Sequence, residues 1–358
     1  MADDRAEPAP RVVLHRLDVV GGLDVLRVAE LPDPEPGPGE VLLDVTASAL
    51  NHLDVDVREG VSRFPVALPH ILGVEPAGRI VALGEGVQGW EVGDRVAAYL
   101  IATCGDCVYC RTGRESLCTA PASFIGMGAQ GAYADKFTCR ASTLIRIPDG
   151  VSDVEAAAAL IAFGTAWHML VTRAKVRAGE KVLISSVGSG IGSAAVQVAK
   201  RCGAFVIGTS SRDDKLEKAA ALGMDAGINY TTQNVAEEVM ALTGGHGVEV
   251  VYEHVGGERF QEALDSLAKD GRVVTCGAHG GEVVPFDIIP FFRRQLSVIG
   301  SFVFDRNEVA TCFELVSRGE LVPQVAATFP LEQAREAMEL MESRDFFGKI
   351  VLTPGGAS

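Results

Sequence analysis

The sequence predicts a two-lobed α/β protein, in which a β-rich lobe is followed by a doubly wound parallel sheet with helices on both faces. Residues 11–150 carry short apolar runs separated by glycine and proline turns, which is typical of strands. From residue 152 to residue 302, strand-like and helix-like segments alternate regularly, as they do in parallel sheets. The 358 residues, 47% of them hydrophobic, exceed the usual size of one compact lobe and suffice for two cores.

In the first lobe, the pair Gly21-Gly22 and the proline-rich segment 32–38 mark turns between apolar runs. We therefore predict an all-β lobe. Its expected strands cover residues 11–17, 25–31, 41–47, 78–83, 94–100 and 131–138.

The second lobe is expected to begin with a helix, because Ser152 and Glu155 have the spacing of a capping box ahead of the apolar residues 156–171. The strands expected after it cover residues 181–187, 205–210, 226–230, 248–255, 272–277 and 296–302. The helices expected between them cover residues 190–202, 213–222, 234–242 and 257–268. The remaining elements are helix 307–318, strand 325–329, helix 331–343 and strand 349–353, which we expect to return to the first lobe. The predicted domains are 1–155 together with 303–358, and 156–302.

Composition excludes several classes of partner. The chain has 32 Lys and Arg against 47 Asp and Glu, a net charge of −15, and no basic patch that would bind nucleic acid or anionic lipid. The first residues lack the apolar segment of a secretory signal. The apolar, uncharged run 156–172 is shorter than the roughly 20 residues that span a bilayer. We expect a cytoplasmic protein with a small-molecule substrate.

A glycine turn lies between the expected strand 181–187 and the helix that follows it. Gly188, Gly190 and Gly192 allow a tight turn and close approach of a pyrophosphate, which Ser189, Ile191 and the helix N-terminus would bind through N–H groups. The strand–turn–helix context favours a dinucleotide site. The alternative is that these glycines serve only close packing of helix on strand.

The residues after the next strand favour NADP(H). NAD sites usually offer an acidic residue to the adenosine ribose about 20 residues after the glycine turn. This chain has Thr209, Ser210, Ser211 and Arg212 there, with Lys215 one turn later, and these groups suit a 2′-phosphate. Alternatively, the arginine and lysine only solvate the next helix, balanced by two neighbouring aspartates.

Four cysteines, Cys104, Cys107, Cys110 and Cys118, stand within one short loop. Four thiolates bind zinc tetrahedrally and leave no open position, so the spacing predicts a structural zinc ion. Disulfides and an iron–sulfur cluster are the weaker alternatives. The other four cysteines lie in apolar stretches and are expected to pack in cores.

Several motifs together resemble the medium-chain dehydrogenase/reductase superfamily over nearly the full length. They are Gly73-Val74-Glu75-Pro-Ala-Gly78, Gly93-Asp94-Arg95-Val96, the run 291–301 and the ending Phe347-Gly-Lys-Ile-Val351. The resemblance implies a GroES-like catalytic domain, a Rossmann domain for NADP(H), and a homodimer or tetramer. The dimer would pair along strand 296–302, whose apolar edge would otherwise be an aggregation hazard.

The chain departs from zinc alcohol dehydrogenases of that superfamily at the catalytic metal. The three ligand positions match Asn51, Val74 and Ile161, and the proton-relay hydroxyl matches Leu53. An amide and two aliphatic side chains do not hold a catalytic zinc ion, which needs about three protein ligands. We expect no second metal. A rearranged site that uses Glu75 with Asp54, His52 or His70 is the alternative.

What remains resembles the quinone oxidoreductase and double-bond reductase branches, which place Asn at the same position. The resemblance implies hydride transfer from NADPH to a quinone or an enone without a catalytic metal. The alternatives are a zinc alcohol dehydrogenase with unusual ligands and a non-catalytic NADPH-binding protein.

Candidate roles follow from these positions. The catalytic candidates are Asn51, as a donor to the substrate oxygen, and Asp54 and Glu75, which would orient its segment. His52 joins them at a position where relatives reach the cofactor pyrophosphate. An Asn that only closes a turn, a surface histidine and a structural ion pair are the competing interpretations. The cofactor set is completed by residues on the helix before the nucleotide sheet, at strand ends and near the C-terminus, namely Thr165, Tyr230, His254, Val255, Gly277, Ala278, Phe302 and Lys349.

Overall fold

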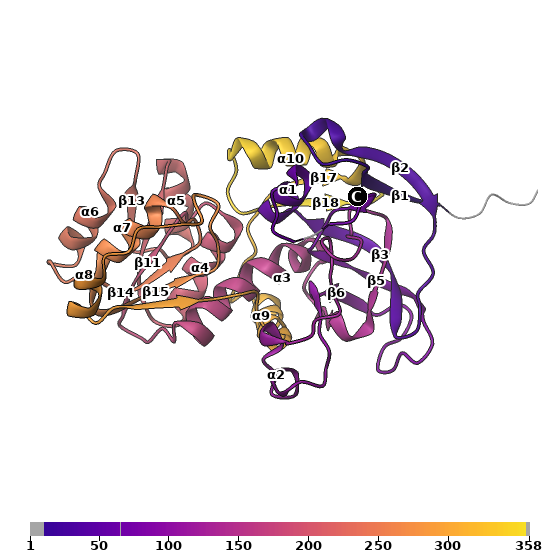
Figure 1. Ribbon diagram of the computed structural model, residues 1–358, viewed down its shortest axis with the longest axis horizontal. Helices are drawn as coiled ribbons and strands as arrows, with labels where there is room; N and C mark the ends of the chain where they lie inside the picture. Colours follow the sequence, from indigo (N-terminus) through magenta and orange to yellow (C-terminus); the bar gives the residue numbers. More distant parts are fainter. Residues whose placement is uncertain (1–10, 65, 356–358) are drawn as a thin grey trace, which may run out of the picture.

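The computed structural model describes residues 11–64 and 66–355. These residues form a β-rich lobe and a second lobe built on a parallel sheet, with one long helix lying between them (Figure 1). The last strands and helix of the chain, drawn in yellow in Figure 1, lie with the first lobe, as expected. The predicted fold class is confirmed, whereas the domain boundaries stay a prediction.

The β-rich lobe contains three sheets. The largest has the strand order β10 (Leu144–Arg146), β6 (Arg95–Ala98), β5 (Pro76–Leu83), β3 (Glu40–Ala49), β18 (Lys349–Thr353) and β17 (Val325–Pro330), and β9 (Lys136–Arg140) also pairs with β3. A three-stranded sheet has the order β2 (Arg27–Pro32), β1 (Arg11–Leu17) and β4 (His70–Ile71). β7 (Ile101–Ala102) pairs with β8 (Ser123–Phe124) beside the cysteine loop.

The second lobe is a six-stranded parallel sheet of the expected kind. Its order is β13 (Ala226–Asn229), β12 (Phe205–Ser210), β11 (Lys181–Ile184), β14 (Val248–Glu253), β15 (Leu267–Thr275) and β16 (Ser297–Gly300). The helices are α4 (Gly190–Arg201), α5 (Asp213–Ala221), α6 (Val235–Leu242), α7 (Glu258–Ser266) and α8 (Ile288–Arg293). The chain order reverses between β11 and β14, and ligands of such sheets bind at that switch point, beyond the carboxyl ends of the strands.

The helix α3 (Asp153–Trp167) connects the two cores. It begins at the predicted capping box, where the Ser152 hydroxyl accepts from Glu155 N–H and the Glu155 carboxylate accepts from Ser152 N–H. It packs against α4 on one side and β3 on the other, and continues as a π-helical turn, His168–Arg173. The span Asp153–Arg173 is long and apolar enough to cross a membrane by composition, but 72% of its most apolar window is buried inside the chain. This is the environment of a core helix.

The first lobe is not all-β, which corrects the prediction. Helix α1 (His52–Glu59) follows β3, and the single-turn α2 (Val108–Arg111) lies in the cysteine loop. The helices α9 (Arg306–Ser317) and α10 (Ala334–Ser343), which pack nearby, were expected. α1 has only eight residues, five of them charged or histidine, so its pattern does not mark it as a helix. Burial of Val55 and Val57 stabilises it. The expected strand 131–138 begins late because Ala132 and Tyr133 bond Gly73 and Leu72 outside any strand.

Candidate active site between the two lobes

The glycine turn between β11 and α4 is built so that side chains are excluded. A Cβ atom at Gly192 would lie 2.3 Å from the carbonyl oxygen of Ser186, and one at Gly190 would lie 2.5 Å from Cδ of Lys349. A Cβ atom at Gly188 would lie 2.7 Å from Cδ of Lys215. Ser189 caps α4, because its hydroxyl accepts from the N–H of Gly192 at 2.9 Å. The first N–H groups of α4, including that of Ile191, are left for an anion at this helix end.

The strand ends around this turn fit a dinucleotide. His254 follows β14, and its Nε2 lies 3.2 Å from the Ser189 hydroxyl. Its Nδ1 is buried and has no hydrogen-bond partner within the described chain. A buried polar atom of this kind needs a partner, which a ligand in the cleft would supply. Burial lowers the pKa of His254 to about 4, so its ring is neutral at physiological pH.

Other predicted cofactor residues lie around the same cleft or farther along the sheet. Gly277 closely approaches His254, since a Cβ there would lie 2.4 Å from the His254 carbonyl oxygen. Thr165 is buried on α3. The remaining predicted residues are partly or largely exposed, namely Val255, Ala278, Tyr230, which stacks under Arg259, and Phe302, which lies just past β16.

The end of β12 carries hydroxyl groups and no carboxylate. Ser210 is buried, and its hydroxyl accepts from the N–H of Arg212 at 3.3 Å. Ser211 separates them. The Arg212 guanidinium pairs with Asp214 and Asp345, and the Lys215 ammonium donates to the carbonyl of Arg344 at 2.6 Å. The two cations therefore stand beside the strand end, but Arg212 is already engaged by two carboxylates.

A buried polar cluster faces this turn from the first lobe. Asn51 ends the segment after β3 and precedes α1, and its amide nitrogen donates to the Glu75 carboxylate at 2.9 Å. The Lys349 ammonium lies 2.7 Å from Glu75 and 2.9 Å from the amide oxygen of Asn51. It also donates to the carbonyl of Leu50 at 2.6 Å, so all three of its protons have acceptors.

Glu75 has no solvent exposure, and its second oxygen accepts from the backbone N–H of Ile161 at 2.5 Å. Complete burial raises the pKa of Glu75, and the Lys349 ammonium and the N–H donors oppose that rise. The Lys349 stem lies against Gly190, and the N–H of Gly348 donates to the carbonyl of Gly188 at 3.0 Å. The polar cluster therefore contacts the dinucleotide turn directly.

Asp54 holds two segments of this site together. Its carboxylate accepts from Asn51 N–H at 2.8 Å, from Gly73 N–H at 3.1 Å and from the Tyr133 hydroxyl at 3.0 Å. Burial raises its pKa to about 6. These bonds make Asp54 a positioning residue that fixes the start of α1 against the segment that carries Glu75.

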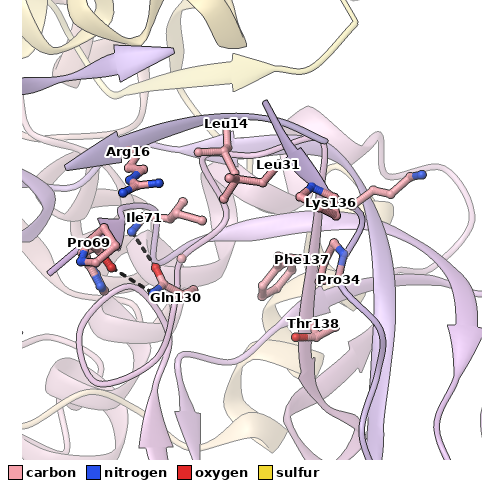
Figure 2. Close-up of a pocket in the computed structure, with 13 residues that line it drawn as sticks. Leu14, Arg16, Leu31, Pro34, Pro69, Ile71, Gln130, Lys136, Phe137 and Thr138 are labelled. Carbon is pink, nitrogen blue, oxygen red and sulfur yellow. Dashed lines mark hydrogen bonds between the residues drawn. The ribbon is translucent and has the colours of Figure 1, made fainter. Parts of the chain in front are cut away.

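This pocket does not fit a catalytic zinc ion of the zinc alcohol dehydrogenase kind. Around Glu75, Val74 and Ile161 present aliphatic side chains, and both ends of the Asn51 amide have protein partners. His70 does not complete a rearranged site, because its ring bonds the carbonyl of Gly126 at 2.9 Å. It lines a separate hollow of about 260 Å³ between β1, β2 and β9, which contains none of the predicted site residues (Figure 2).

His52, the fourth catalytic candidate, does not touch this cluster in any contact of the described residues. It stands at the start of α1, and its ring contacts the ring of His279, with centroids 4.3 Å apart. His279 follows β15 and was not among the predicted residues. Only the fold brings these two histidines together, since they are far apart in sequence.

The four predicted zinc ligands converge. The Sγ atoms of Cys107 and Cys110 are 3.5 Å apart, those of Cys104 and Cys118 are 3.6 Å apart, and those of Cys104 and Cys110 are 3.9 Å apart. A tetrahedral ion with Zn–S bonds of about 2.3 Å requires ligand separations of about 3.8 Å. The N–H groups of Cys107 and Cys110 also point at neighbouring sulfur atoms, which stabilises thiolates. These residues fit a closed, structural zinc site.

A glycine turn at the switch point of a parallel sheet, facing a buried polar cluster from a GroES-like lobe, has the architecture of a dinucleotide-dependent oxidoreductase. The family description "Zinc-binding dehydrogenase" matches residues 190–318, and "Alcohol dehydrogenase GroES-like domain" matches residues 37–149.

Relatives span both lobes. A 2-haloacrylate reductase from a Burkholderia species is 33% identical, covering 96% of this chain and 98% of that protein. Acryloyl-coenzyme A reductase from Metallosphaera sedula is 31% identical, covering 91% and 96%. A solved NAD-dependent alcohol dehydrogenase is 40% identical with a TM-score of 0.91, covering 96% of this chain and 100% of that one. The chain belongs to the medium-chain dehydrogenase/reductase superfamily and is an oxidoreductase.

Proposed function

We propose that this protein is an NADPH-dependent reductase of activated carbon–carbon double bonds or quinones that uses no catalytic metal ion. The observation that carries the proposal is the pocket around Glu75, where an amide, two aliphatic side chains and an ammonium group replace a set of metal ligands. Zinc alcohol dehydrogenases activate the alcohol with a Lewis acid and a hydroxyl relay, and Leu53 stands where the relay hydroxyl would be. Reduction of a conjugated acceptor needs no Lewis acid, and its proton can come from solvent.

The relatives named as 2-haloacrylate reductase and acryloyl-coenzyme A reductase support this substrate class, since both names describe a double bond conjugated to a carbonyl group. The solved alcohol dehydrogenase relative favours a second candidate, dehydrogenation of alcohols. That reaction would require a metal ion beside Glu75, and therefore a different arrangement of Asn51 and Lys349.

NADPH held at the glycine turn would supply the hydride for the β-carbon of the enone, and solvent would supply the proton for the α-carbon. Asn51 stabilises the negative charge that develops on the substrate oxygen. One proton of its amide is held by Glu75, but the other makes only a long contact of 3.3 Å to the carbonyl of Ala49. A substrate oxygen can displace that contact. Such a donor in a dry site contributes about 3 kcal/mol.

Lys349 and Glu75 position this amide. The Lys349 ammonium donates to the amide oxygen of Asn51 and so fixes the orientation of the amide. The N–H₂ group is then directed toward oxygen acceptors, such as the carbonyl oxygen of a substrate. Ser189 and the N-terminus of α4 bind the pyrophosphate, and Ser210, Ser211, Arg212 and Lys215 bind the 2′-phosphate. The absence of a carboxylate at the end of β12 supports NADP(H) over NAD(H).

The test compares two reactions on one preparation of known metal content. NADPH oxidation is followed with 2-cyclohexenone, an acrylate ester and a benzoquinone, and NADP⁺ reduction is followed with primary and secondary alcohols, each with and without added Zn²⁺. We expect enone or quinone reduction, one zinc ion per chain, and no stimulation by metal. Alcohol oxidation that appears only with added metal would overturn the proposal.

The Asn51→Ala variant separates the role of the amide from that of the scaffold. Loss of about 3 kcal/mol of transition-state stabilisation corresponds to a fall in kcat of about 10²-fold, with a small change in NADPH affinity. Asn307→Ala, which removes an exposed amide on α9, is the matched control. Equal effects of the two substitutions on kcat would remove Asn51 from the mechanism.

A further inference from the structure

We propose that His52, Asp56 and His279 form a second metal site, specific for a divalent transition-metal ion such as Zn²⁺ or Co²⁺, which links the two lobes at the rim of the cofactor cleft. His52 and Asp56 lie one turn apart on α1 of the β-rich lobe. His279 lies on the loop after β15 in the parallel-sheet lobe. The site exists only where the two lobes meet.

The ligand atoms are already close to coordinating positions. One ligand atom from each of the three residues lies within 4.8 Å of the other two. Nδ1 of His279 is 3.6 Å from the Asp56 carboxylate, and the two imidazole rings meet edge to face at 70°. A tetrahedral ion with bonds of about 2.0–2.1 Å needs ligand separations of about 3.4 Å. Small side-chain rotations are therefore sufficient.

The donor set selects the class of ion. Two imidazoles and one carboxylate match zinc sites that keep one open position, and they suit Zn²⁺ or Co²⁺ better than Mg²⁺ or Ca²⁺, which prefer oxygen ligands. The His279 side chain is 44% exposed, so an ion can reach it from solvent. Burial and the neighbouring His52 lower the pKa of His279, which keeps its ring neutral and its lone pair available.

The charges around the site determine its affinity for a metal ion. Asp56 is its only carboxylate, and Arg344 adds a positive charge that opposes a cation. The cysteine loop, with four thiolates, should therefore bind a metal ion before this site does. The site also differs from the pocket around Glu75, because Glu75 is paired with Lys349 and is not among the residues that converge here.

An ion at this position would join the lobes across the cleft. Arg63 of the β-rich lobe and Glu282 of the other lobe already make an exposed ion pair in the same region, and such pairs contribute little. Coordinate bonds to a metal ion would resist separation of the two lobes far more strongly than this ion pair does. Metal binding would therefore slow cofactor exchange. The metal site itself does not depend on the reductase function proposed above.

The experiment uses the full-length protein with its cysteine site loaded with zinc. Co²⁺ is added and binding is measured by calorimetry and by visible absorption, which reports tetrahedral Co²⁺ with nitrogen and oxygen ligands. We expect one additional ion per chain. His279→Asn should weaken this binding by at least about 10–100-fold, as losses around metal sites do, and Asp56→Asn should also weaken it.

His246→Asn is the matched control, because His246 is also exposed and also pairs with a carboxylate, that of Glu249. It should leave Co²⁺ binding unchanged. Thermal unfolding without Co²⁺ shows that the variants are folded, since both positions are partly exposed. Wild-type protein that binds no ion beyond the cysteine site, or a second ion that persists in His279→Asn, would overturn the proposal.

Discussion

Two regions of the molecule stand where zinc dehydrogenases of this superfamily hold metal ions, and they have opposite chemistry. The loop of Cys104, Cys107, Cys110 and Cys118 gathers soft donors at distances that fit zinc. The pocket around Glu75 instead gathers groups that satisfy one another: an amide, a carboxylate and an ammonium group. The first region offers four ligands that fit a metal ion, whereas in the second region the side chains satisfy one another.

The contrast has a structural cause. The cysteine loop docks on the rest of the protein largely through Glu115, which binds Arg306 of α9, and through Ser116, whose N–H donates to Asp305. It has few buried apolar residues of its own. The pocket around Glu75 lies between α3, β18 and the glycine turn, where close packing already holds each side chain. The difference indicates which region should depend on metal.

The largest expected effect comes from breaking the cysteine site. Cys110→Ser should remove zinc from the protein and strongly destabilise the loop, because structural zinc binding is worth about 10–16 kcal/mol in small domains. Elemental analysis and limited proteolysis of the loop measure this. Cys202→Ser, outside the loop, is the control. A Cys110→Ser protein that keeps one zinc ion per chain would contradict the assignment.

The next effect concerns the ion pair in the other region. Lys349→Met leaves the Glu75 carboxylate buried without its cation, so the free energy of unfolding should fall by about 3–5 kcal/mol. Urea titration measures the change. The double variant Lys349→Met/Glu75→Gln should recover most of the loss, because no buried charge then remains. If the double variant is as unstable as the single one, the charge pairing does not explain the stability of the pocket.

A third prediction uses the buried titratable groups of the cleft. The pKa of His254 is lowered from 6.5 to about 4, so its contribution to stability is present above pH 6.5 and is lost as the pH falls toward 4. Relative to His254→Gln, the wild type should lose about 3 kcal/mol of unfolding free energy between pH 7 and pH 4. Denaturant titrations at several pH values measure this difference.

The comparison with a variant is needed because Asp54 acts in the opposite direction. Its pKa is raised from 3.8 to about 6, so its contribution favours folding below pH 3.8 and is lost as the pH rises through 6. In the wild type alone the two groups partly cancel. A pH-independent difference between wild type and His254→Gln would show that His254 is not held neutral.

The smallest effect is on cofactor choice. Ser210→Asp places a carboxylate at the end of β12, which would repel a 2′-phosphate and accept from ribose hydroxyls. The ratio of kcat/KM for NADPH to that for NADH should fall by about 10–100-fold, or about 1.4–2.8 kcal/mol. Thr231→Asp, after β13, is the control. A wild-type preference for NADH would reverse the NADP(H) prediction.

The parallel sheet could be predicted from sequence in detail because its signals are local. Strand β12 has the predicted boundaries, and the glycine turn marks the start of α4. In the β-rich lobe, β18 also has the predicted boundaries. Helix α1 was missed because its eight residues lack a strong apolar face, and α8 because it is a single short segment. Tertiary packing stabilises such elements.

The site was predictable only in part. Asn51 and Glu75 could be placed near each other because the family motifs align them. Lys349 was predicted as a cofactor residue, but its bond to Asn51 joins positions 298 apart, and no local pattern shows such a contact. The same holds for His279, whose neighbours on α1 belong to the other lobe. The ending Phe347-Gly-Lys was the one signal that pointed to Lys349.

The aliphatic stem of Lys349 packs against Gly190, and its ammonium group donates a hydrogen bond to the Asn51 amide oxygen. One side chain thus contacts both the glycine turn proposed to bind the cofactor and the amide proposed to bind the substrate. Any shift of the turn as a nucleotide enters is passed to the amide that receives the second molecule, so the two affinities are thermodynamically linked, each raising or lowering the other by an equal factor. Such linkage is reciprocal, so a substitution at Lys349 should change the two affinities together, whichever molecule enters first.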